Sequence, residues 1–336
     1  MPKRFWWPTA WFFVVLSFLA ALAAGRYFIP FGNVCGILVS QIFPLEPWWT
    51  DIQYRVVIFI RLPRVLGAAL AGATLSMSGA ALQGILKNPL VSTQLIGVTS
   101  GAGFGGVMAI LLFESAFATM GFAYTGGILS IVLVWFLCNR GRGSSPLSLV
   151  LAGVIINAFF LALISLIEYV ADPYNKLPAI VVWLMGSFAS LSWDRLLSSA
   201  PSLIVAGMLL FLLRFRINVL SLGSEEAQAL GVDTGWTRWF VMAIVALVAS
   251  ATVAMAGIVG WIGLVVPHIA RMFVGNDHKY LIPLSCLLGS IYTVFIDTLA
   301  RTLIEVEIPM GVLTALVGTP LFAILMNKMM KKEEEA

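Results

Sequence analysis

Asp297 and Arg301 lie four positions apart in an otherwise apolar stretch, where charged residues are costly and often functional. This spacing places both side chains on one face of a helix, where they can pair. A carboxylate that relays protons is the alternative role for Asp297. Glu114 and Glu168 fall near the ends of apolar stretches, and His268 lies within a short one. The chain therefore offers few groups for chemistry inside a membrane.

Phosphate-binding and metal-binding patterns are missing from the sequence. No Gly-x-x-x-x-Gly-Lys-Ser/Thr loop occurs, and the dipeptide Gly-Lys is absent, so the chain cannot cradle ATP phosphates in the usual way. Cys35, Cys138 and Cys286 are widely separated, which favours packing roles. We expect no catalytic residue, no metal and no cofactor bound by this chain. Any ATP-driven mechanism would therefore need a partner ATPase that binds ATP and its Mg ion.

The composition indicates a membrane protein. Of 336 residues, 60% are hydrophobic and 11% are charged, which leaves too little polar surface for a soluble core. A helix needs roughly 20 apolar residues to cross a bilayer. We predict an all-α integral membrane fold, a single transmembrane domain over 1–336 with about ten transmembrane helices. The apolar segments are 6–24, 62–83, 93–113, 124–138, 147–170, 197–213, 236–256, 262–274, 281–300 and 311–327. The short stretches 178–189 and 262–274 are interpreted as half-helices.

Lys and Arg residues indicate the orientation of these helices. With both termini cytoplasmic and ten crossings, most basic residues fall on the cytoplasmic side. The apolar run after Met1 also resembles a signal peptide, but a retained first helix fits the charge distribution better. A weak echo at an offset of 178 residues, for example Thr74 with Thr252 and Gly79 with Gly257, suggests an inverted internal repeat.

A short polar segment, about 221–231, separates the sixth and seventh predicted spans. Ser224 can cap a helix, Glu225 and Glu226 suit its positive end, and Gly231 suits a left-handed stop. An ordinary interfacial turn is the simpler interpretation. A cytoplasmic docking element is the sharper one.

Several motifs spread over 58–328 resemble the FecCD family, the permeases of type II ABC importers for iron–siderophore complexes, haem and cobalamin. The motifs are Arg61-Leu62-Pro63-Arg64, Ser78 to Gln83, Lys87-Asn88-Pro89-Leu90, Leu151 to Val154, Trp183 to Gly186, Gly260 to Arg271 and Ile308 to Val312. The resemblance implies a permease that is not itself an enzyme. It works as a homodimer with two ATP-binding subunits and a periplasmic or lipid-anchored substrate-binding protein, in the cytoplasmic (inner) membrane of a bacterium or archaeon. Membrane lipid is a further partner, and nucleic acid is not.

The resemblance also assigns residues. Leu222, Gly223, Glu225, Glu226, Ala229, Leu230 and Gly231 match the family's coupling helix, which contacts the ATPase. Arg61, Arg64 and Arg301 match arginines that meet acidic residues of the binding protein; helix anchoring at the lipid headgroups is the simpler alternative. The family's polar gate falls near Ser144 and Ser145, although the following Pro146-Leu147 departs from a polar pattern. Asn157 either faces the translocation path or bonds a neighbouring helix.

The resulting expectation is an ATP-driven importer permease for a metal chelate, with a ferric siderophore or haem first. Cobalamin and molybdate or tungstate are the alternatives within the same importer type. An ion-gradient-driven secondary carrier is the alternative of another class, but it would need charged residues clustered near mid-membrane.

Overall fold

The computed structural model describes residues 6–113, 115–139 and 145–334, and within these ranges the fold is helical without strands. Six helical stretches are long and apolar enough to cross a membrane: Asp51–Ile85, Ala116–Cys138, Pro146–Val170, Trp193–Leu222, Thr234–Ala256 and His278–Thr302. Shorter apolar helices accompany them, at Trp7–Ala23, Phe31–Ser40, Val98–Leu112, Ile262–Val274 and Met310–Leu325. Each of the ten predicted segments coincides with one helix, so the all-α membrane fold is confirmed.

The helices that match the predicted segments are α1 (Trp6–Ala23), α4 (Leu62–Ile85), α5 (Val98–Leu112), α6 (Ala116–Asn139), α7 (Pro146–Val170), α9 (Trp193–Leu222), α11 (Thr234–Ala256), α12 (Ile262–Val274), α13 (His278–Thr302) and α14 (Met310–Glu334). The short stretch predicted at 178–189 forms α8 (Lys176–Leu184), and α12 is also short. α9 extends well beyond its predicted limits of 197–213. α5 begins late, because the turn before it ends at Gly97 with a left-handed φ of 79°.

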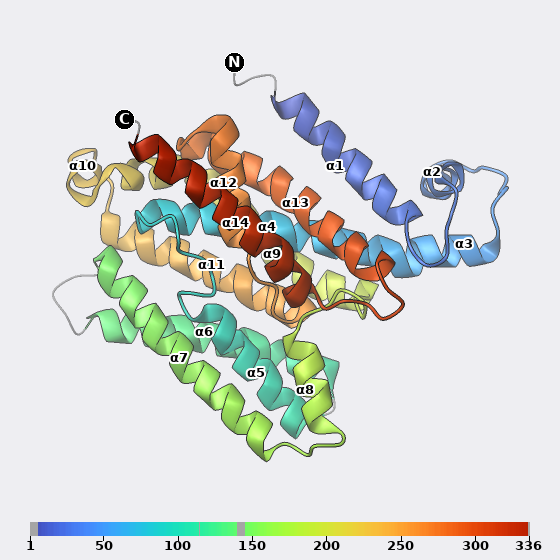
Figure 1. Ribbon diagram of the computed structural model, residues 1–336, viewed down its shortest axis with the longest axis horizontal. Coiled ribbons are helices and arrows are strands. Elements are labelled where there is room, and N and C mark those ends of the chain that lie inside the picture. Colours follow the sequence, from blue (N-terminus) through green and yellow to red (C-terminus); the bar gives the residue numbers. More distant parts are fainter. Residues whose placement is uncertain (1–5, 114, 140–144, 335–336) are drawn as a thin grey trace.

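Three further elements follow α1 and were not predicted. α2 (Phe31–Ser40) is followed by α3 (Asp51–Arg55) and a π-helical stretch, η1 (Val56–Arg61), which continues directly into α4. Thr50 begins this long helix with a capping box, because its hydroxyl accepts from the Gln53 N–H while the Gln53 side chain accepts from the Thr50 N–H. Together α2 and α3 lie at the end of the molecule opposite to α10 (Ser224–Ala229) (Figure 1).

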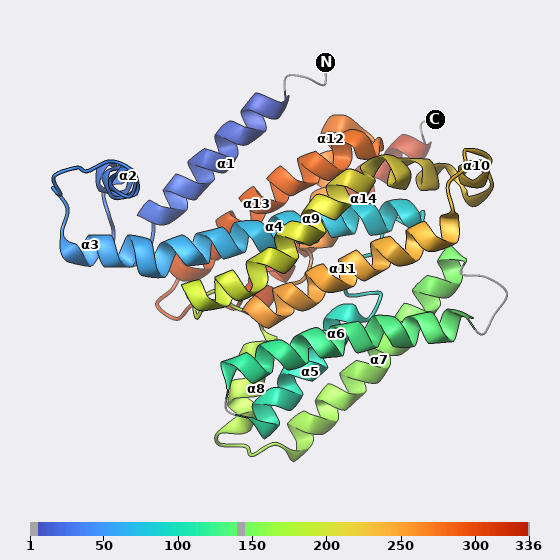
Figure 2. The ribbon, with the colours of Figure 1, turned by 180° about the vertical axis from the view of Figure 1, so that it is seen from behind.

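The most enclosed spans are α4 and α11, which run in opposite directions through the middle of the molecule (Figures 1 and 2). This antiparallel course is the one that the weak 178-residue echo requires. α14 runs toward the end of the molecule that carries α10, whereas α1 runs toward the end that carries α2 and α3 (Figures 1 and 2). The cytoplasmic placement of the two termini stays a prediction.

Glycine permits the closest helix crossings. A Cβ atom at Gly79 of α4 would overlap the carbonyl oxygen of Gly263 in α12, and one at Gly105 of α5 would overlap that of Phe122 in α6. Gly101 likewise faces Gly126 of α6. Gly101 and Gly105, spaced four apart in α5, therefore act in helix packing.

Candidate functional site: a polar segment at one end and an arginine cluster at the other

The polar segment between α9 and α11 presents an exposed surface. α9 ends at Leu222, Gly223 follows with φ 159°, and α10 ends before Gly231, whose left-handed φ of 77° confirms the predicted stop. Leu222 and Leu230 are 58% and 63% exposed. Glu225, Glu226, Ala229 and Gly231 are also exposed, whereas Ala227 is fully buried and anchors the segment. Two apolar side chains and two carboxylates thus project from one short segment.

Ser224 does not cap this helix, contrary to prediction. It is the first helical residue, preceded by Gly223 at the N-cap position, and no side-chain cap hydrogen bond forms. The hydroxyl of Ser224 instead accepts a hydrogen bond from Nη2 of Arg238 in α11, at 2.7 Å. The sequence pattern suggested a local partner for Ser224, but the longer Arg238 side chain reaches it across the fold.

A second tether joins the segment to α4. Lys87, which follows α4 with a left-handed φ of 49°, donates from Nζ to the carbonyl oxygen of Leu222 at 2.7 Å. This bond satisfies a free carbonyl at the C-terminal end of α9. The Arg238 and Lys87 contacts tie the segment to α11 and α4, the two most enclosed spans. These two hydrogen bonds thus link α10 to the interior of the bundle.

A polar pocket of about 310 Å³ lies beside this tether. Its lining consists of Gln83, Gly84, Lys87, Asn88, Pro89, Ser221, Arg271, Asn276 and His278, with no acidic side chain among these residues. Nη1 of Arg271 and Oε1 of Gln83 are buried without hydrogen-bond partners. The end of the molecule that carries α10 thus combines an acidic projection with a basic recess.

At the opposite end, the structure brings Arg61, Arg64 and Arg301 together, from η1, α4 and α13. All three are buried, with 4%, 6% and 5% exposure. Arg61 donates to the carbonyl oxygens of Leu22 and Ala23 at 2.7 and 2.9 Å and to that of Tyr27, while Arg301 donates to those of Ala24 at 2.7 Å and Ala21. The two guanidinium groups therefore cap the C-terminal end of α1, where free carbonyls carry negative partial charge.

Arg64 makes the ion pairs of this arginine cluster. It contacts both carboxylate oxygens of Asp297 at 3.0–3.1 Å and both of Glu307 at 2.9–3.0 Å. Asp297 also lies 3.8 Å from Nε of Arg301, which confirms the predicted pairing at i and i+4. Partial burial acts to raise the pKa of Glu307, but the hydrogen bonds and charge of Arg64, with smaller effects from Arg26 and Arg301, hold that pKa below its ordinary value.

A pocket of about 170 Å³ opens onto this cluster. Arg26, Arg61, Arg64, Arg301 and Glu307 are among its lining residues. The Glu307 side chain is 30% exposed, whereas that of Asp297 is 1% exposed. Of the two acidic partners of Arg64, Glu307 is therefore the one that a carboxylate from another protein could displace more easily.

The predicted path residues are only partly described. Ser144 lies outside the described residues. Ser145 caps α7, because its hydroxyl accepts from the Ser148 N–H at 3.1 Å. Asn157 is half-buried on α7, beside the turn that ends at Gly97. Ser145 and Asn157 therefore lie at different levels of α7, and a gate at Ser144 and Ser145 stays a prediction.

Sequence reasoning missed several residues of these sites. Glu307 lies in the α13–α14 connection, and nothing in its spacing points to Arg64, which is far away in the chain. The partners of Arg61 and Arg301 are main-chain carbonyl groups, which every residue has, so the sequence does not reveal them. Lys87 was noted only as part of a motif. Among the described residues, no group of three or more His, Cys, Asp or Glu side chains could hold a metal ion.

A bundle of apolar helices with glycine crossings, a tethered polar projection at one end and paired charges at the other defines a multi-pass integral membrane protein. The chain belongs to the FecCD transport family, whose model matches residues 13–328.

The permease relatives cover most of the chain. The molybdate import system permease protein of Haemophilus influenzae is 40% identical over 316 residues, covering 94% of this chain and 93% of the relative. The hemin transport system permease protein of Yersinia pestis is 38% identical over 280 residues, covering 81% and 83%. A solved structure described as an inward-facing conformation of a metal-chelate type ABC transporter superposes with a TM-score of 0.87 at 38% identity, covering 98% of this chain and all of that one.

These findings establish a multi-pass membrane permease subunit of a type II ABC importer. Such a subunit is not an enzyme, because ATP hydrolysis resides in a separate chain, and it implies ATPase and binding-protein partners. The alternative of an ion-gradient-driven carrier is therefore wrong.

Proposed function

We propose that two copies of this permease form the path for a metal chelate, a ferric siderophore or haem, into the cytoplasm of a bacterium or archaeon. The single observation that carries the proposal is the tethered α10 segment, which has no use in a carrier that works alone. Membership of the FecCD family and the likeness to a metal-chelate type transporter support the cargo class. Molybdate is the second candidate, favoured by the 40% identical relative from Haemophilus influenzae. Cobalamin stays a third.

The proposed wall of the path is α7. Leu147, Leu151, Ile155 and Phe159 are exposed and follow each other at intervals of four residues, so they form one apolar stripe. The described part of α7 carries one charged residue, Glu168, close to its C-terminal end. An apolar wall of this kind has little with which to bind a polar cargo, so selection is assigned to the binding protein.

The α10 segment, from Leu222 to Gly231, is proposed to seat the ATP-binding subunit at the cytoplasmic side. Its two exposed leucines supply apolar contact, and its tethers to α4 and α11 supply the route by which a movement of the ATPase reaches the path. The basic pocket beside it offers a complementary site for acidic groups of the same partner.

We propose that the binding protein docks over Arg61, Arg64 and Arg301. Because these side chains are buried, an acidic group of the binding protein has to enter the pocket to contact them. A carboxylate of that partner enters the 170 Å³ pocket and replaces Glu307 on Arg64, while Arg61 and Arg301 keep their bonds to α1. Glu307→Gln should then raise the affinity of the binding protein, since it weakens the competitor. Unchanged or lower affinity would leave the cluster with a structural role only.

The cargo is tested by transport. Permease, ATPase and binding protein are reconstituted in liposomes, and ATP-dependent uptake of radiolabelled ferric siderophore, haem, cobalamin and molybdate is compared. The proposal expects uptake of a metal chelate that excess molybdate does not inhibit. If molybdate is the only compound taken up, the cargo is an oxyanion and the chelate proposal is wrong, although the importer mechanism still holds.

A further inference from the structure

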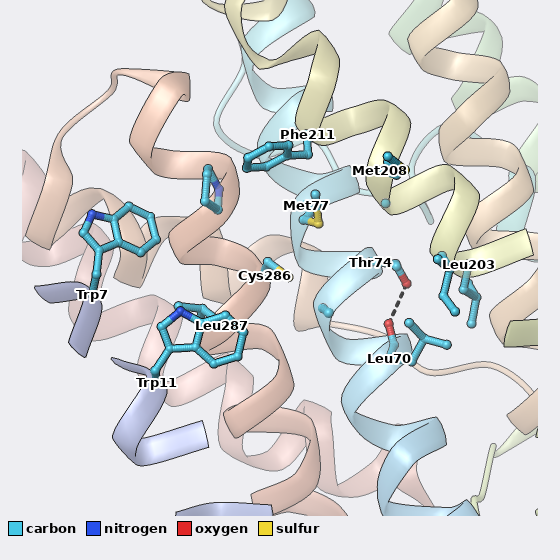
Figure 3. Close-up of a pocket in the computed structure, with 14 residues that line it drawn as sticks. Trp7, Trp11, Leu70, Thr74, Met77, Leu203, Met208, Phe211, Cys286 and Leu287 are labelled. Atoms are coloured by element: carbon cyan, nitrogen blue, oxygen red, sulfur yellow. Dashed lines mark hydrogen bonds between the residues drawn. The ribbon is translucent and has the colours of Figure 1, made fainter. Parts of the chain in front are cut away.

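An apolar groove of about 510 Å³ opens on the membrane-spanning part of the molecule, between α1, α4, α9 and α13 (Figure 3). Trp7 and Trp11 of α1 stand on one side, Met208 and Phe211 of α9 on the other, and Met77 of α4 lies between them (Figure 3). The side chains that line the groove are almost entirely hydrocarbon, thioether or indole in character. α1 and α9 therefore face each other across space that no side chain fills.

The groove offers little that would hold water. The one hydroxyl in its lining, that of Thr74, donates to the carbonyl oxygen of Leu70 at 2.8 Å (Figure 3). Apolar cavities stay dry and take up apolar ligands; a cavity of ~150 Å³ accepts benzene with its six carbons. By that ratio, 510 Å³ accommodates roughly twenty carbon atoms, which is the size of one lipid acyl chain.

A cation lies at one end of the groove. Ile204, Met208 and Phe211 form a stripe along α9, and the stripe continues toward α10 with Arg214. The guanidinium carbon of Arg214 lies 3.9 Å from the ring centroid of Phe211 and 4.4 Å from that of Phe215. Nη1 of Arg214 donates to the carbonyl oxygen of Phe211 at 2.7 Å. This bond uses one of the five donors of the group, so phosphate can be bound by others.

We propose that the groove between α1 and α9 binds one anionic phospholipid, with an acyl chain along Met77 and Phe211 and the phosphate on Arg214. The apolar lining, the volume and the cation at the end where α9 leaves the bilayer together fit this molecule. The alternative occupant is a second copy of the chain, which would have to insert a projecting apolar element into the groove and place an acidic group on Arg214. The test must distinguish this occupant from a lipid.

The test uses the full-length permease with its ATPase, extracted in detergent and delipidated. The complex is then given phosphatidylglycerol or phosphatidylcholine. Their acyl chains have 16 or 18 carbons, because the groove has room for roughly twenty. Native mass spectrometry then counts the lipids retained. We expect one tightly held phosphatidylglycerol per permease chain. Arg214→Gln should reduce the preference for phosphatidylglycerol over phosphatidylcholine about tenfold. Arg216→Gln, on the opposite face of the same turn, should leave it unchanged.

Blocking the groove provides the second arm. A Cβ atom at Gly207 would lie 3.3 Å from the Thr74 methyl group and 3.9 Å from the Met77 sulfur, so Gly207→Leu fills the groove. Gly121 of α6 has no atom within 4 Å of an added Cβ, which makes Gly121→Leu the matched control. Gly207→Leu should lose the retained lipid of either headgroup, and Gly121→Leu should keep it.

A spectroscopic readout guards against a folding defect of Gly207→Leu. With one equivalent of phosphatidylglycerol brominated in mid-chain, quenching of tryptophan fluorescence should fall in Trp11→Phe and persist in Trp135→Phe, on the exposed face of α6. Equal quenching in both variants would overturn the proposal. Lipid retention at the wild-type level in Gly207→Leu would also overturn it. If Gly207→Leu changes from dimer to monomer while its lipid count is unaltered, the occupant of the groove is a second copy of the chain.

Discussion

Asp297→Asn removes the charge at the centre of the arginine cluster while keeping the shape of the side chain. The carboxylate of Asp297 is 1% exposed and binds Arg64 at 3.0 Å, with Arg301 at 3.8 Å. Loss of one member of a buried ion pair costs about 3–5 kcal/mol, because the remaining charge is left uncompensated in a poorly polarisable environment. After the substitution, Arg64 keeps Glu307 as its acidic partner, and Arg301 loses the carboxylate that lies 3.8 Å from its Nε. We therefore expect the free energy of unfolding to fall by about 3 kcal/mol or more.

Glu307→Gln is the matched control, because it removes a carboxylate from the same guanidinium group. The Glu307 side chain is 30% exposed, so solvent screens its interaction and the expected loss is about 1 kcal/mol or less. Both free energies are measured by reversible unfolding in mixed micelles, with helical circular dichroism as the signal. An equal or larger loss for Glu307→Gln would refute the conclusion that burial sets the energetic order of the two acids.

Three further outcomes follow. Leu230→Glu should abolish binding of the ATPase in a co-purification assay, whereas Val306→Glu, at an even more exposed apolar position at the opposite end, should not. Retained binding in Leu230→Glu would make α10 a passive loop. Since the pKa of Glu307 is lowered from its ordinary 4.5, its stabilising contribution is present above that value and is lost as the pH falls through the folded-state pKa. The difference in unfolding free energy between wild type and Glu307→Gln should thus vanish on acidification. A difference that grows instead would show that the pKa of Glu307 is raised by folding rather than lowered. Gly79→Leu should prevent α4 from packing on Gly263 and yield aggregated protein on size-exclusion chromatography; a monodisperse product would contradict the tight crossing.

The ten apolar segments were predictable because each is an apolar run bounded by charge, glycine or proline, and six of them form helices long enough to cross a membrane. The helices missed lie outside that pattern. α2 is short, and α3 begins with the polar residues Asp51 and Gln53, so hydropathy alone gives no reason to join it to α4. The limits of α9 were wrong because its last turns carry Arg214 and Arg216, which project at the membrane surface while the backbone stays helical.

The sites were predictable only where the signal is local. The stop at Gly231 and the pairing of Asp297 with Arg301 depend on neighbours in sequence, and both are confirmed. The Ser224 cap failed because Arg238, fourteen residues away, competes for the hydroxyl. The capping of α1 by Arg61 and Arg301 involves main-chain carbonyls, which every residue possesses, so no sequence pattern could reveal it.

The coupling of transport to a separate ATPase is tested most directly by cargo uptake into proteoliposomes that contain the permease and its binding protein, with and without the ATP-binding subunit. We predict uptake only when that subunit and ATP are present, and at an undiminished rate after an uncoupler has dissipated ion gradients. Uptake by the permease without the ATP-binding subunit, driven by an ion gradient and abolished by the uncoupler, would contradict the account.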